Sequence, residues 1–135
     1  METNTILLVQ SSFKKLKPLG QGTATYFYDK LLELDPDLKR LYFSNSKESI
    51  QEFGTAFMNI LATTVSYLDN FKQLKPILYN LGKVIQSKQL KPTFFDFIGT
   101  AFMASLSNSL QEEFTLEVEL AWFQYFQKIS QTIQL

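Results

Sequence analysis

Hydrophobic residues recur at intervals of three and four along nearly the whole chain, and this spacing constrains the fold most strongly. Ile6, Val9 and Phe13 follow it near the N-terminus, which predicts an amphipathic helix from about residue 4 to 16. Apolar and polar residues nowhere alternate over more than about four positions, as a half-buried β-strand requires. The chain is therefore predicted to be all-α.

Capping and turn residues divide this pattern into separate helices. Pro18 ends the first helix, and a second is predicted from about Gly20 to Leu34. Asp35 and Pro36 then provide a cap and a first-turn proline, so a short helix is expected over 37–42. The remaining stripes predict helices over about residues 50–68, 74–85, 92–106 and, after a cap at Thr115, 118–133.

Length and composition limit the chain to one domain and exclude several classes of function. At 135 residues it can bury one core, so residues 1–135 are predicted to form a single domain. Apolar residues make up 45% of the chain, including 13 Phe, and supply that core. Because 13 basic residues balance 13 acidic ones, we expect no nucleic-acid partner.

Signals for export or membrane insertion are missing from the sequence. The N-terminal segment METNTILLVQSS lacks the basic start and long apolar core of a signal peptide. No apolar run approaches the roughly 20 residues that span a bilayer. We expect a soluble, cytoplasmic protein with no membrane partner.

Several short segments carry a resemblance to a known family. They are Leu41-Tyr42 after Asp35-Pro36, Leu81-Gly82, Leu90-Lys91-Pro92, Phe95 with Ile98-Gly99-Thr100-Ala101, Phe114-Thr115, and Ala121-Trp122 with Tyr125. These segments resemble single-domain bacterial haemoglobins and the globin domain of flavohaemoglobins over almost the whole chain. The resemblance implies the globin fold, a three-over-three helical sandwich of about seven to eight helices that cross around a pocket.

The resemblance also assigns residues to the distal side of a haem pocket. Tyr28 matches a distal tyrosine that often donates a hydrogen bond to bound oxygen, and Tyr42 matches a phenylalanine that packs on the porphyrin. Glu52 falls where a distal Gln or His usually lies. Ala56 falls where the family has a larger apolar residue over the iron.

The proximal side departs from the family. Ile85 replaces the histidine that holds the iron, Phe95 replaces a tyrosine beside it, and the chain contains no histidine or cysteine. Protein-bound haem iron needs an imidazole, thiolate, thioether or phenolate, and isoleucine has no lone pair to offer. We therefore expect Ile85 to fill core space, with no haem and no metal site. Tyr28 as phenolate, Glu52 as carboxylate and Lys83 as amine remain open as other iron ligands.

Two functions follow from these residues. The first is a haem-free, non-enzymatic globin that acts as a binding, sensory or regulatory module, whose residual pocket takes a small apolar ligand such as a fatty acid. The alternative is a haem globin that handles oxygen or nitric oxide with an unusual or absent protein ligand to the iron. An enzyme is not expected, because the chain lacks the His and Cys on which most catalytic triads depend.

The final helix carries more apolar surface than one core face requires. Phe123 and Phe126 lie beside its core stripe of Val118, Trp122 and Tyr125. Excess aromatic surface often marks a contact, so we expect a symmetric homodimer formed through the last two helices. The alternative is that Phe126 simply completes the core of a monomer.

Overall fold

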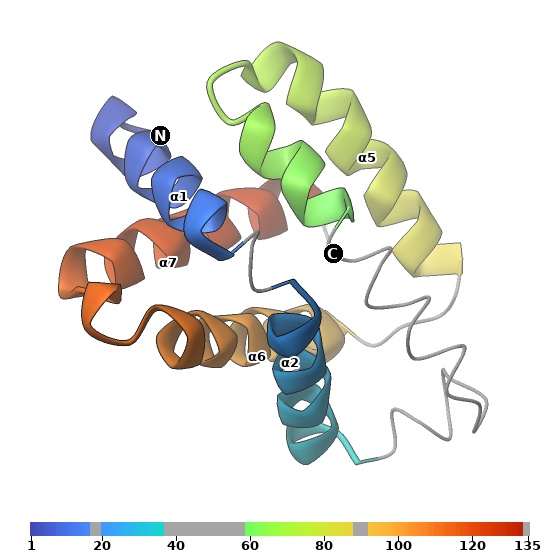
Figure 1. Ribbon diagram of the computed structural model, residues 1–135. Coiled ribbons are helices and arrows are strands. Elements are labelled where there is room, and N and C mark those ends of the chain that lie inside the picture. Colours follow the sequence, from blue (N-terminus) through green and yellow to red (C-terminus); the bar gives the residue numbers. More distant parts are fainter. Residues whose placement is uncertain (17–19, 37–58, 88–91, 134–135) are drawn as a thin grey trace.

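The computed structural model describes residues 1–16, 20–36, 59–87 and 92–133, and within these ranges its regular structure is helical (Figure 1). The elements are α1 (Thr3–Leu16), α2 (Gly20–Leu34), a helical stretch over 59–66, α5 (Phe71–Ser87), α6 (Pro92–Leu110), the 3₁₀ helix η2 (Gln111–Glu113) and α7 (Leu116–Ile133). The all-α prediction is confirmed. The predicted helix over 37–42 and the first part of the one over 50–68 lie outside the described residues.

Local chemistry explains where the last helices begin. α6 starts at Pro92, whose fixed φ suits the first turn and whose missing N–H has no partner to lose there. Thr115 caps α7, because its hydroxyl oxygen accepts a hydrogen bond from the backbone N–H of Val118 at 3.3 Å. Both starts were predicted from the sequence.

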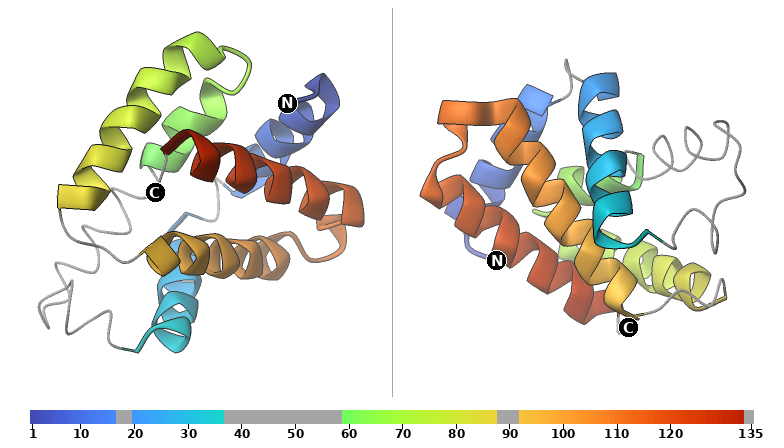
Figure 2. Two further views of the ribbon diagram at one scale, coloured as in Figure 1. Left: turned by 180° about the vertical axis from the view of Figure 1, so that it is seen from behind. Right: turned by 90° about the horizontal axis from the view of Figure 1, so that it is seen from below.

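The helices pack as crossing pairs. α2 packs against α6, whereas α1 and α5 both pack against α7. In Figures 1 and 2, α6 and α7 run side by side, and α2 crosses α6. The helical stretch over 59–66 turns back into α5 beside α7.

An aromatic cluster forms the centre of the core. The Trp122 ring is fully buried, with its centroid 5.1 Å from those of both Phe102 and Tyr125. Phe126 lies 5.8 Å from Phe102 and is partly buried against the same cluster, so it does complete the core. Phe123 instead stays 56% exposed. The two phenylalanines of α7 therefore have different roles.

Hydrogen bonds inside this core join distant helices. The indole N–H of Trp122 donates to the hydroxyl of Ser12 at 2.8 Å, and that hydroxyl donates to the carbonyl of Leu8 at 2.7 Å. The hydroxyls of Thr64 and Tyr125 are also hydrogen-bonded to each other. Buried polar tips of this kind need partners, and these bonds supply them.

Among the described helices, none is both long and apolar enough to cross a bilayer.

Candidate functional site

The predicted pocket residues divide into a described and an undescribed set. Tyr28 lies on α2 and is buried, at 6% exposure, and Phe95 lies on α6, partly buried against the core. Because α2 packs against α6, these two residues belong to neighbouring helices. Position 85 lies within α5, four residues after Leu81, although the Ile85 side chain is not described. Tyr42, Glu52 and Ala56 lie outside the described residues.

Two contacts position α2, which carries Tyr28, against α6. The hydroxyls of Thr23 and Ser109 are hydrogen-bonded at 3.0 Å. The rings of Phe27 and Phe102 meet edge to face with centroids 6.4 Å apart. Together they bring the buried side of α2 onto α6 and so position Tyr28 in the interior.

The environment of Tyr28 keeps its phenol protonated. Burial raises the pKa of the Tyr28 phenol above its ordinary value of 10.0, and the negative charge of Asp29 raises this pKa further. At neutral pH the side chain is therefore a neutral hydroxyl that can donate a hydrogen bond. This suits the role that the resemblance assigns to Tyr28.

The donor chemistry of the chain only partly fits haem. No imidazole or thiolate exists anywhere in the sequence, and in the described part no three His, Cys, Asp or Glu residues gather as a metal site. The Lys83 ammonium lies 5.4 Å from the ring of exposed Tyr79, so that lysine is turned to the outer face of α5. Phenolate is a known haem ligand, and Tyr28 is the described pocket residue that can supply one.

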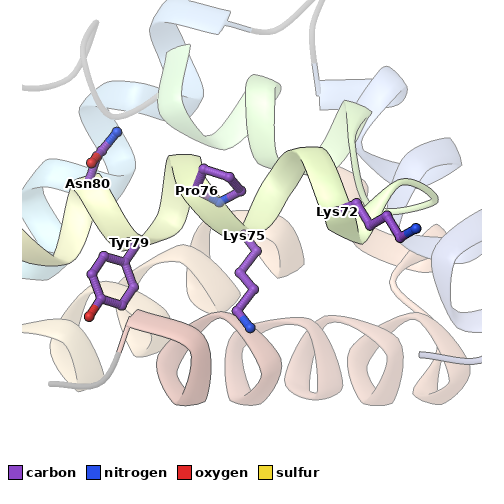
Figure 3. A pocket seen from close by; sticks show the side chains of 5 residues that line it. All are labelled: Lys72, Lys75, Pro76, Tyr79 and Asn80. Carbon is purple, nitrogen blue, oxygen red and sulfur yellow. The ribbon is translucent and has the colours of Figure 1, made fainter.

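The outer face of α5 also forms a shallow groove that the sequence did not reveal. It measures about 450 Å³ and is lined by Lys72, Lys75, Pro76, Tyr79 and Asn80 (Figure 3). From the sequence these lysines look like an ordinary solvated face, although all five residues that line the groove belong to α5. It lies outside the predicted pocket.

Comparison with sequence families and curated proteins gives one consistent result. The globin family model matches residues 25–133. A neuroglobin of Tetraodon nigroviridis is 28% identical over 129 residues, which cover 88% of this chain and 81% of the neuroglobin. A flavohemoprotein of Bacillus subtilis is 22% identical over 123 residues, which cover 90% of this chain but only 30% of that protein.

A solved structure shows the same fold. The hexacoordinated heme protein from an anhydrobiotic tardigrade superposes with a TM-score of 0.87, covering 98% of this chain and 92% of the other. The two sequences are 17% identical, so this likeness speaks for the fold alone. The match of the globin family model to residues 25–133 establishes that the protein belongs to the globin family.

Proposed function

We propose that this protein is a non-enzymatic, ligand-binding globin that holds haem without a histidine. The observation that carries the proposal is the globin match across residues 25–133 combined with a buried phenol, Tyr28, on α2. Two of the proteins it resembles, the flavohemoprotein and the tardigrade protein, are named for haem. This favours haem over the haem-free globin that the missing histidine alone predicts.

In this proposal Tyr28 would hold the iron of a bound haem through its phenol oxygen. Burial raises the pKa of this phenol, so the proton stays on while no cation is near. A bound cation reverses this preference, because a nearby positive charge favours the anionic form. Haem bound here would supply an iron centre for a small gas such as oxygen or nitric oxide. Phe95, partly buried on α6, would help to exclude water.

A second candidate is a haem-free globin, and one specific observation favours it. The chain has no histidine at all, and Ile85 occupies the position where the resemblance expects the iron ligand. In this form the protein would act as a sensory or regulatory module, through a small apolar ligand such as a fatty acid. The resemblance to bacterial single-domain globins is compatible with either candidate.

The visible spectrum of protein purified from haem-supplied cells tests the proposal. We expect a Soret band together with a phenolate-to-iron charge-transfer band. Tyr28→Phe should abolish the charge-transfer band, because phenylalanine offers no oxygen donor. The matched control is Tyr67→Phe, since Tyr67 is 38% exposed and lies in the turn after the 59–66 helix.

Two outcomes would count against the proposal. Protein with no Soret band from haem-supplied cells supports the haem-free candidate instead. If the Soret band is equally unchanged in Tyr28→Phe and Tyr67→Phe, the protein binds haem but Tyr28 is not its ligand. Far-UV circular dichroism of both variants checks that the helices remain intact.

A further inference from the structure

One face of α5 combines positive charge with apolar surface. Lys72, Lys75, Tyr79 and Lys83 recur at intervals of three and four, so they line one side of the helix. Figure 3 shows Lys75 and Tyr79 projecting from the same side of α5. We call these four residues the basic face; three of them, Lys72, Lys75 and Tyr79, also line the groove described above.

Within the described residues, the lysines of the basic face form no ion pair. The Lys83 ammonium lies over the Tyr79 ring, and the Lys128 ammonium of α7 lies 4.6 Å from the Phe71 ring centre, which extends the positive surface. The ion pairs found among the described residues involve Lys15 and Lys30, and none involves these lysines. Asp69, in the turn before α5, is the carboxylate nearest to Lys72 and Lys75 in sequence.

The first half of α7 combines negative charge with apolar surface. Leu116, Leu120 and Phe123 are 69%, 52% and 56% exposed. Their spacing of four and three residues makes one continuous apolar stripe. We call this stripe the acidic ridge, because glutamates flank it. Glu117 and Glu119 are exposed and lie on the two flanks of this stripe, about 100° and 60° around the helix from Leu116. Neither glutamate forms an ion pair within the described part of the chain.

The basic face and the acidic ridge lie toward different ends of the molecule. α7 ends against α5, where Gly82 lies close to Ile133. The ridge occupies the other end of α7, beside η2 and away from α5 (Figure 1). One molecule therefore cannot bring its own ridge onto its own basic face, whereas two copies can.

We propose that the acidic ridge of one molecule docks onto the basic face of a second copy, head to tail. At a rise of 1.5 Å per residue the ridge is about 10.5 Å long and the basic face about 16.5 Å, so the ridge and both glutamates fit within it. The three apolar side chains meet Pro76 and Tyr79 in the groove, while Glu117 and Glu119 approach lysines. The two surfaces are complementary in charge.

A symmetric dimer through the same ridge lacks this complementarity. Pairing two ridges places Glu117 and Glu119 of one copy near the same glutamates of the other, and like charges at an interface repel. The head-to-tail contact also leaves one free ridge and one free basic face on every pair. Assembly therefore continues into rings or open chains as the concentration rises. Because the contact is small and charged, it should be weak and sensitive to salt.

The test mixes two variants that are each defective on one side. The ridge variant carries Leu120→Glu and Phe123→Glu, and the face variant carries Lys72→Glu and Lys75→Glu. All four side chains are exposed, so the fold should survive, which circular dichroism checks. Sedimentation velocity at low salt then measures the mass of each sample.

We expect wild-type protein to exceed the 15.6 kDa monomer mass increasingly with concentration, and added salt to reverse this. Each variant alone should stay monomeric. Their equimolar mixture should form a 1:1 dimer and nothing larger, since one intact ridge then meets one intact basic face. The control pair is Leu7→Glu, at an exposed leucine of α1, and Lys14→Glu; both should assemble like wild type.

Three results would overturn the proposal. If wild-type protein stays at 15.6 kDa up to about millimolar concentration, the contact does not form even with a dissociation constant of about 1 mM. A face variant that still dimerises alone would indicate a symmetric ridge-to-ridge dimer. Monomeric protein that binds laurate, and loses this binding on Lys72→Glu and Lys75→Glu, would assign the groove to a small anion instead.

Discussion

Gly82 of α5 lies so close to the end of α7 that a Cβ atom at this position would be 2.7 Å from the carbonyl oxygen of Ile133. The neighbouring atom belongs to the backbone, so it cannot rotate away as a flexible side chain could. This close approach gives a physical reason for the Leu81-Gly82 pair that contributed to the family resemblance. It also fixes how tightly α5 packs on α7.

Gly82→Ala should therefore destabilise the fold. We expect a loss of about 1–3 kcal/mol from overpacking, partly offset by the higher helix propensity of alanine, which is worth about 1 kcal/mol. Gly22→Ala is the matched control, because a Cβ at Gly22 meets no atom within 4 Å and should stabilise α2. Urea denaturation compares the two variants. Equal free energies of unfolding for the two variants would show that α7 moves away from the added Cβ without loss of stability.

The Ser12–Trp122 hydrogen bond predicts a second loss of stability. Ser12→Ala leaves the buried indole N–H of Trp122 without its acceptor, at a cost of about 1–3 kcal/mol. Ser11→Ala, at the exposed neighbouring position, should change the free energy of unfolding by no more than about 0.5 kcal/mol. Trp122 is the single tryptophan, so its fluorescence follows unfolding in both variants. Indistinguishable transitions would contradict this role of the bond.

Alkaline pH should destabilise the protein through its buried tyrosines. Burial raises the pKa of Tyr125 far above its ordinary value of 10.0, although the hydrogen bond with Thr64 opposes this, and burial also raises the pKa of Tyr28. A group whose pKa is raised by folding contributes stability below its unfolded pKa and loses it as pH rises toward the folded value. The free energy of unfolding should thus be flat near pH 8 and fall above about pH 10.

Tyr125→Phe provides the check on this assignment. The variant loses the Thr64 hydrogen bond and should be less stable at pH 8, but its stability should fall less steeply above pH 10. Urea denaturation at a series of pH values measures both slopes. A variant whose stability falls as steeply as that of the wild type would show that Tyr125 is not responsible.

The sequence revealed the helices better than the contacts between them. Spacing and caps located α2 and the starts of α6 and α7, because these features depend on residues close together in the chain. The separate roles of Phe123 and Phe126 were not predictable, since they lie three residues apart on one helix and only packing on Phe102 distinguishes them. The partner of Trp122 was missed because Ser12 lies on a distant helix and nothing local marks it.

The candidate site was predictable only where the resemblance supplied positions. Tyr28 and Phe95 were assigned in this way, and the structure places both on helices that pack together. The absence of histidine was visible at once, but it does not reveal whether another donor replaces the imidazole. The groove on α5 was not foreseen, because the spacing of Lys72 and Lys75 places them on one helix face but does not show whether that face is hollowed.

Titration of the purified protein with haemin tests whether this globin holds haem. We expect the chain, which has no histidine, to take up about one equivalent of haemin, with a shifted Soret band that saturates. Tyr28→Phe should weaken this binding, whereas Tyr67→Phe should leave it unchanged. Absorbance that rises in proportion to added haemin, with no saturation and no difference between the variants, would contradict the claim that this globin holds haem.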